Sequence, residues 1–537
     1  MMEPDFTFGL IRVIILLLGV YALSASLYGS LFAKRAPSKA AEKTSEPPTI
    51  SSRIPYIGHV LQVMRTDFQE YFGRLSVSQA TPVSVAQLFT QRIYVVDASD
   101  TEMTKLFART PGLSLTAAFW VGFGGYLHFN KASEESMMTP DKHPFKRELS
   151  RLLRDELQTL EKVQKLGAQV QRKINQAWQR TVPDDSNTVK LAEWVSDGIA
   201  MSVGSVIWGD KGPYDDPKFR QSLRTMLCGL RRFYHPLTLF LPSSFRRARD
   251  HVRAGLSTLD APRSGDQEEP DCDDLCFIGK VKILLQKYSI PQAGWNDFSF
   301  SLIMGVFPNL INITTWALWH LVADDELMAA IRAEVDALVE PSPDPANSQR
   351  KKVDVSRVRE SCPLLMSFWY ELLRLYAANS NITRLVTHDA VFPGGSLLSF
   401  RRKALVVAPM LPHQHGRDGW GQDAEVLRAD RFLDAEGRVD AGLVRRLMAF
   451  GLPTVLMCPG RYVVFNVVML NIIKTLLTFD IAPARGETLN GGQGVCRPRR
   501  SMVAGVPEPS HDPELVLTKR VDVGSVHVTF ENQRPGW

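Results

Sequence analysis

A single cysteine with unusual neighbours is the first candidate for chemistry. Cys458 stands at the start of Cys-Pro-Gly-Arg, and an apolar run continues from Arg461 to Phe479. Apolar residues cover nearly every face of that run, which predicts a buried helix. A helix start offers free N–H groups and the positive end of a dipole, so we expect a lowered thiol pKa. Cys458 is therefore a candidate thiolate ligand for iron; the alternative is an ordinary small hydrophobic residue.

A carboxylate and a guanidinium form the second candidate constellation. Glu371 and Arg374 are three residues apart in Phe-Trp-Tyr-Glu-Leu-Leu-Arg-Leu. This spacing places both side chains on one face of a helix, where they can pair. Because apolar residues surround them, the pair is expected to be buried and fully hydrogen-bonded.

A long apolar segment supplies the third set of polar residues. Residues 296–323 predict one helix that crosses the core, with Pro308 in its middle. Proline removes its own hydrogen bond to the carbonyl of Met304, which predicts a kink there. Asn309 directly follows Pro308, and Thr314 lies about one turn beyond Asn309. We treat both as catalytic candidates. The alternative is that their side chains only bond the backbone inside a kinked helix.

The cysteine segment resembles the haem-ligand loop of the cytochrome P450 family. Phe450-Gly451 precedes Cys458-Pro459-Gly460-Arg461 as in that family, in which the cysteine thiolate binds haem iron. Phe450 lies one residue further from the cysteine than in the family, and Thr454 takes the place of a glycine. The resemblance implies a mainly α fold with a smaller β region, haem b as cofactor, and Cys458 as cofactor-binding residue and metal ligand.

The resemblance also assigns roles to other residues. Glu371 and Arg374 match the family's Glu-x-x-Arg pair, and Arg431 in Asp-Arg-Phe matches its third member, so these three are expected to be structural. Arg384, which enters a predicted strand, and His413 are candidates to bind a haem propionate. Asn309, Thr314 and Trp316 fit the branch that includes sterol 7α-hydroxylase and prostacyclin synthase.

The central helix departs from the common monooxygenase pattern, in which an acid followed by threonine delivers protons. Here Asn309 is followed by Leu310. An amide cannot relay a proton as an acid does, so ordered water, Thr314 or the substrate itself must substitute. The first reading is a monooxygenase that hydroxylates or epoxidises a lipophilic small molecule, a terpenoid, steroid or polyketide, in secondary-metabolite biosynthesis. The others are an isomerase or dehydratase that needs neither O₂ nor reductant, and a non-catalytic haem-binding protein.

The amino end predicts a membrane anchor. Residues 13–32 carry no charge and are long enough to cross a bilayer as a helix. Acidic residues precede this run and basic residues follow it, which places the remainder in the cytosol. We therefore expect an anchor at 1–35, a polar linker at 36–53 and a catalytic domain at 54–537, held at the endoplasmic reticulum by a single span. A cleaved signal peptide is the alternative.

Composition limits the partners. In 537 residues, Lys and Arg exceed Asp and Glu by only 6, which gives no indication of nucleic-acid binding. Six cysteines show neither the density of a disulfide scaffold nor paired zinc spacing, in keeping with a reducing compartment. The resemblance implies electrons from NADPH through a separate NADPH–cytochrome P450 reductase.

Further elements are expected around these residues. Alternating segments at 82–88 and 92–96 predict a β-hairpin, and the sequence from 144 to 169 predicts a helix. Residues 501–507 and 515–520 predict terminal strands. A strand-like segment at 526–530 has no assigned neighbour.

Overall fold

The computed structural model assigns the chain to two compact units, one of residues 1–118 and 381–412 and one of residues 119–380 and 413–537. It describes residues 46–52, 58–66, 68–78, 81–88, 91–97, 110–115, 117–118, 130, 143–182, 186–210, 212–228, 243–257, 276–340, 351–377, 381–393, 397–451, 457–487, 489, 505–521 and 525–530. The expected membrane anchor and linker, 1–53, fall almost entirely outside these residues. The described part is mainly helical with smaller sheets, as expected.

The first unit is built on a five-stranded sheet in the order β1-β2-β9-β6-β3. The predicted hairpin is confirmed, because β1 pairs antiparallel with β2. Strand β2 pairs parallel with β9, which brings two parts of the chain that are far apart in sequence into one sheet. The strands are β1 (Val83–Leu88), β2 (Gln91–Val96), β3 (Leu113–Ser114), β6 (Ile382–Val386) and β9 (Leu405–Ala408).

Two helices and a pair of short strands also belong to the described part of the first unit. Helix α2 (Gly58–Arg65) contacts β1, and α3 (Phe68–Ser78) contacts β2. Strands β7 (Ala390–Pro393) and β8 (Leu397–Phe400) form a separate antiparallel pair.

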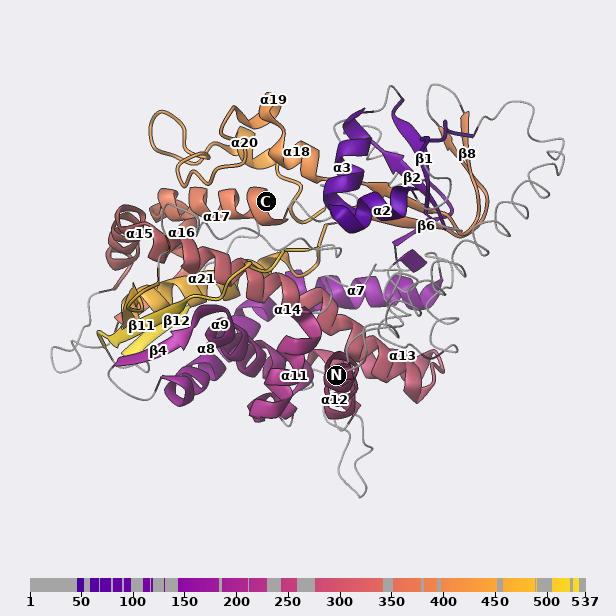
Figure 1. Ribbon diagram of the computed structural model, residues 1–537. Helices are drawn as coiled ribbons and strands as arrows, with labels where there is room; N and C mark the ends of the chain where they lie inside the picture. Colours follow the sequence, from indigo (N-terminus) through magenta and orange to yellow (C-terminus); the bar gives the residue numbers. More distant parts are fainter. Residues whose placement is uncertain are drawn as a thin grey trace, which may run out of the picture. The chain divides into compact units, whose positions relative to one another are not determined.

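The second unit contains most of the helices (Figure 1). The predicted helix over 144–169 is instead two helices, because Thr159 adopts an extended conformation between them. The helices of eight or more residues are α7 (Pro144–Gln158), α8 (Leu160–Thr181), α9 (Leu191–Ile199), α11 (Pro217–Cys228), α12 (Ser243–Ser257), α13 (Phe277–Lys287), α14 (Gln292–Ala323), α15 (Asp325–Ala337), α17 (Pro363–Tyr376) and α21 (Arg461–Thr478).

Helices α14 and α21 form the centre of this unit and contact each other. Helix α14 begins four residues earlier than expected and continues as one helix through Pro308. Both are long and apolar enough to span a membrane, but 61% and 83% of their most apolar windows are buried, as in core helices. Most of their apolar residues therefore pack against protein.

Two small sheets lie among the described residues of the second unit. Strands β10 (Phe479–Pro483), β11 (Glu514–Lys519) and β4 (Ser186–Lys190) form an antiparallel sheet in the order β10-β11-β4. The unassigned segment near the carboxyl end forms β12 (Val526–Thr529), which pairs parallel with β5 (Lys351–Asp354). The predicted strand at 515–520 is confirmed as β11. Of the strand predicted at 501–507, residues 501–504 lie outside the described part and residues 505–507 form no strand.

Candidate active site

Cys458 lies just before α21, and its backbone is held on both sides. Its N–H donates to the carbonyl of Phe450 (2.8 Å), and its own carbonyl accepts a hydrogen bond from Nη1 of Arg461 (3.1 Å). Gly460 is the N-cap residue of α21. These contacts fix the place of the sulfur at the amino-terminal end of a buried helix.

The thiol pKa does not follow the expectation from the helix start. Burial raises the pKa of Cys458, while the N–H of Gly460, donated to the sulfur, and the nearby guanidinium of Arg461 act in the opposite direction. Desolvation therefore outweighs the helix end, because an unpaired thiolate loses more hydration than these groups replace. Cys458 nevertheless keeps solvent-accessible surface. The protein around the sulfur is still dense enough to disfavour a free thiolate.

Glu371 and Arg374 lie together on α17 and are fully buried. Two parallel hydrogen bonds join them, from Nε of Arg374 to Oε2 (2.7 Å) and from Nη2 to Oε1 (2.8 Å). Nη1 of Arg374 donates to the carbonyls of Gln414 (2.8 Å) and Ala424 (2.6 Å). A buried ion pair is tolerated only when its polar atoms are satisfied in this way.

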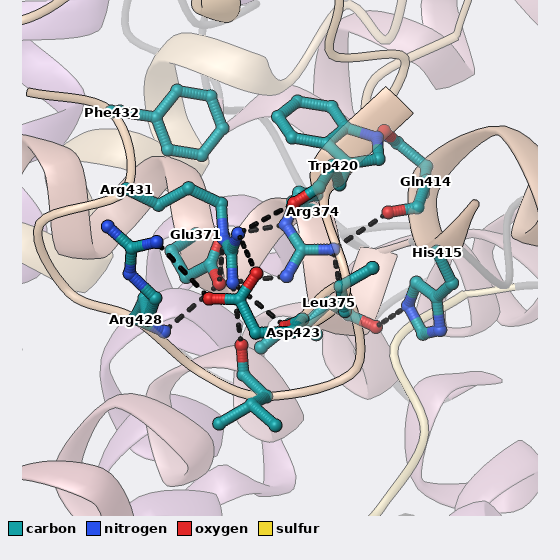
Figure 2. A network of polar contacts seen from close by, with 12 residues as sticks. Glu371, Arg374, Leu375, Gln414, His415, Trp420, Asp423, Arg428, Arg431 and Phe432 are labelled. Atoms are coloured by element: carbon teal, nitrogen blue, oxygen red, sulfur yellow. Dashed lines mark hydrogen bonds and ion pairs between the residues drawn. The ribbon is translucent and has the colours of Figure 1, made fainter. Parts of the chain in front are cut away.

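Arg431 approaches the same carboxylate from the loop before α20 (Ala441–Arg445), as Figure 2 shows. Its Nε donates to Oε1 of Glu371 (2.9 Å), and its Nη1 and Nη2 donate to the carbonyls of Trp420 (2.9 Å), Asp423 (2.9 Å) and Val426 (3.1 Å). The structure thus brings together the three residues expected to be structural, and the two arginines also bind backbone carbonyls of residues 414–426.

Two further residues belong to this network and were missed in the sequence. Asp423 accepts a hydrogen bond from Nη1 of Arg431 (3.0 Å) and pairs with Arg428, and these contacts lower the pKa of Asp423 to about 2. The N–H of Arg428 also donates to Glu371 (3.1 Å). An acid followed by two arginines within eight residues is a common loop pattern, so the sequence alone carried no signal for these contacts.

Asn309 and Thr314 both bond the backbone of their own helix. Nδ2 of Asn309 donates to the carbonyl of Gly305 (3.1 Å), and Oγ1 of the buried Thr314 donates to the carbonyl of Leu310 (2.8 Å). Oδ1 of Asn309 also accepts the N–H of Val506 (2.9 Å). The bonding that was the alternative to a catalytic role is thus present for both residues, and their catalytic role stays a prediction.

The two candidates for binding a propionate lie in different settings. Arg384 is buried on β6, and its Nη1 donates to the carbonyl of Thr383 (2.8 Å). His413 lies on α18 (Leu411–His415), and its Nε2 donates to the carbonyl of Arg446 (3.0 Å) at the end of α20, so part of its hydrogen-bonding capacity is already used. Their role toward a propionate stays a prediction.

Comparison with known proteins gives the family. The model of the family "Cytochrome P450" matches residues 286–498, which contain α14, the buried network and Cys458. A cytochrome P450 monooxygenase from Gibberella zeae is 22% identical over 447 residues, which cover 82% of each chain. Residues 286–498 are therefore a cytochrome P450 domain, and the chain is accordingly a P450 monooxygenase, an oxidoreductase.

Two further relatives extend this result. The cytochrome P450 monooxygenase nodJ of Hypoxylon pulicicidum is 22% identical over 524 residues, 94% of this chain and 95% of the relative. The 25-hydroxycholesterol 7-alpha-hydroxylase of Rattus norvegicus is 29% identical over 214 residues, 38% of this P450 and 50% of the relative. A P450 carries haem and receives electrons from a redox partner.

The residues around Cys458 fit a haem thiolate. Within the described residues, no group of three or more His, Cys, Asp or Glu side chains could hold a metal ion. An N–H group aimed at the sulfur is the donor expected beside a thiolate ligand.

Proposed function

We propose that this P450 hydroxylates or epoxidises a lipophilic small molecule, a terpenoid, steroid or polyketide, in secondary-metabolite biosynthesis. The proposed enzyme binds haem b through Cys458 and takes electrons from NADPH through NADPH–cytochrome P450 reductase. The observation that carries the proposal is Cys458, an accessible cysteine pinned at the start of the buried helix α21.

The chain's own residues have distinct tasks in this proposal. Haem, when bound, supplies the metal ion that stabilises the Cys458 thiolate and the redox chemistry at oxygen. The N–H of Gly460 and the guanidinium of Arg461 stabilise negative charge on the sulfur. The network of Glu371, Arg374 and Arg431 holds the loop before α20, and Arg384 and His413 are the proposed propionate partners.

Thr314 is the proposed proton-handling residue. It is the hydroxyl residue on the same side of α14 as Leu310, one turn further along the helix. Its hydroxyl proton points to the carbonyl of Leu310 (2.8 Å), while its oxygen keeps lone pairs that can accept a hydrogen bond from water or substrate. In this arrangement Thr314 orders a proton donor and does not act as the acid itself.

The substrate class is supported by the relatives and by the helix. Relatives include fungal P450 monooxygenases and a protein named as a 25-hydroxycholesterol 7-alpha-hydroxylase. Helix α14 is apolar along most of its length, with few groups that could bind a charged substrate. A lipophilic substrate also suits an enzyme at a membrane surface, which the uncharged run at 13–32 supports. We propose a single span in the endoplasmic reticulum, with the catalytic domain in the cytosol.

The deciding assay measures product from purified enzyme with and without NADPH and reductase, using a panel of terpenoid, steroid and polyketide substrates. Strict dependence on NADPH with label from ¹⁸O₂ in the product is expected. Turnover without electrons would instead identify an isomerase or dehydratase. Haem binding without any substrate-induced change of iron spin state across the panel would favour a non-catalytic haem protein.

A further inference from the structure

Three polar side chains on α14 grip one short segment near the carboxyl end. Oδ1 of Asn309 accepts the N–H of Val506 (2.9 Å), and Nδ2 of Asn312 donates to the carbonyl of Val506 (2.8 Å). Nε1 of Trp316 donates to the carbonyl of Pro507 (2.8 Å). Spacings of three and four residues place these side chains on one face of the helix.

The gripped segment has no strand partner. Val506 and Pro507 are buried and belong to no β-strand in the described part of the chain. Buried backbone groups must nonetheless be hydrogen-bonded. Side chains of α14 bind the N–H and carbonyl of Val506 and the carbonyl of Pro507. They satisfy these backbone groups as a neighbouring strand would.

Asn309 uses both ends of its amide. While Oδ1 accepts from Val506, Nδ2 donates to the carbonyl of Gly305 (3.1 Å). An ionised aspartate at this position has no donor, so one of its oxygens would face the Gly305 carbonyl. The bonding pattern therefore requires an amide and disfavours the acid that other monooxygenases carry in this place.

Gly505 allows the close approach. Its φ of +125° lies in the region that favours glycine, and a Cβ there would lie 2.5 Å from Oδ1 of Asn309. A side chain at 505 would therefore push the segment off the helix. The glycine and the asparagine fit each other as a pair.

The catalytic candidate points elsewhere. With about 100° of rotation per residue, Thr314 lies roughly 140° around the helix from Asn309 and about 40° from Leu310. The gripping face and the Thr314 face are therefore different sides of α14. A side chain on the first cannot deliver a proton to a group that faces the second.

We infer that Asn309 is a positioning residue that, with Asn312 and Trp316, locks the segment 505–507 onto α14, and that it is not a proton donor. The inference deepens the proposed monooxygenase function and rests on it for the link to the reaction. The lock fixes α14 in rotation and position next to Pro308, where the helix lacks one backbone hydrogen bond. The rotation of α14 in turn sets the direction in which Thr314 points.

The test compares Asn309→Asp and Asn309→Ala in the full-length holoenzyme with Asn296→Asp, which adds an acid to the same helix away from the segment. Hydrogen–deuterium exchange of a peptide covering 505–508 is expected to be about tenfold faster in both Asn309 variants and unchanged in the control. Unchanged exchange in the Asn309 variants would overturn the lock.

A second readout separates positioning from proton delivery. The pH profile of NADPH oxidation with reductase is expected to keep the wild-type shape in Asn309→Asp. A new acidic limb, or a gain in rate over the wild type, would overturn the inference. Hydrogen–deuterium exchange reports the binding of segment 505–507 to α14 and does not depend on catalysis. If the Asn309 variants exchange faster but the wild type forms no product with NADPH, the result counts against the proposed function alone.

A double-mutant comparison guards against variants that fold poorly. Gly505→Ala is expected to lower the melting temperature, and the loss is expected to be smaller in an Asn309→Ala background, where the clashing oxygen is gone. Strictly additive losses would contradict a direct fit between Gly505 and Asn309.

Discussion

Nε2 of His320 lies 2.6 Å from the hydroxyl oxygen of Tyr376. The phenol ring of Tyr376 stacks on the indole of Trp316, with ring centroids 4.2 Å apart and planes at 7°. The imidazole is surrounded by protein, and burial lowers the pKa of His320 to about 4. The neutral ring therefore accepts a hydrogen bond from the phenol hydroxyl, and the pair joins the end of α14 to the end of α17.

This relationship predicts an acid-dependent loss of stability. The pKa of His320 is lower in the folded state than the ordinary value of 6.5, so the unfolded chain binds the proton more strongly. Stability is then complete above about pH 6.5 and falls as the pH drops toward 4, by about 3 kcal/mol for this group. Melting temperatures from pH 7.5 to 4.5 should show the fall, and His320→Gln should flatten it. An equally steep fall in the variant would contradict the assignment.

Removing Arg374 should prevent haem loading. Arg374→Ala leaves the carboxylate of Glu371 buried with fewer partners, at a cost of about 3–5 kcal/mol, a large part of the stability of a typical domain. The measurement is the haem content of purified protein and the spectrum of its reduced CO complex. Arg438→Ala is the control, because Arg438 forms only exposed ion pairs with Asp434 and Glu436. Fully loaded, active Arg374→Ala protein would show that the network is dispensable.

Cys458→Ser should lose the spectrum of a thiolate–haem–CO complex. A serine oxygen replaces the sulfur that gives the reduced CO complex its red-shifted Soret band. Cys228→Ser, at the exposed end of α11, should keep the band. Persistence of the red-shifted band in Cys458→Ser would mean that another residue is the ligand.

Thr314 and Thr315 form a matched pair for testing proton handling. Both are fully buried on α14, and each hydroxyl donates to the carbonyl four residues earlier at 2.8 Å. Alanine at either position should cost similar stability. Only Thr314→Ala should lower the product formed per NADPH, because Thr315 lies about 100° further around the helix. Equal yields in the two variants would remove Thr314 from the reaction.

Gln171 should matter more for stability than its position on α8 suggests. This buried residue accepts the N–H of Val528 (2.8 Å), and its Nε2 lies 2.9 Å from Nδ1 of His527. Gln171→Ala leaves the Val528 N–H without this partner, which costs about 1–3 kcal/mol. The exposed Gln292→Ala is the control in thermal melts. Similar melting temperatures for both variants would mean that water replaces the lost hydrogen bond to the N–H of Val528.

The sequence predicted what depends on short-range pattern. Apolar residues on every face identified α21, alternation identified the β1–β2 hairpin, and a spacing of three placed Glu371 beside Arg374. It could not predict where the segment 505–507 docks, because the partners of Val506 lie nearly two hundred residues away. The spacing of Asn309, Asn312 and Trp316 on one helix face was a usable signal for a polar seam, although not for its occupant.

The thiol pKa shows a different limit of sequence reasoning. A helix start lowers the pKa of Cys458, and burial raises it. The local sequence reveals the first effect, whereas the second depends on how many distant residues surround the sulfur. The break at Thr159 is a similar case, because the apolar pattern continues across it.

The parallel pairing of β12 with β5 requires two distant parts of the chain to meet during folding. Val353 and Val528 are partners, and β12 is also held by Gln171 on α8 and by Nζ of Lys474 on α21, which donates to the carbonyl of Val526 (2.9 Å). Closing a loop of roughly 175 residues is entropically costly, and such contacts form late in folding. Until β12 arrives, the buried amine of Lys474 lacks its carbonyl partner and the edge of β5 lacks its strand. A partly folded chain that lacked β12 would expose the edge of β5 to pairing with another chain.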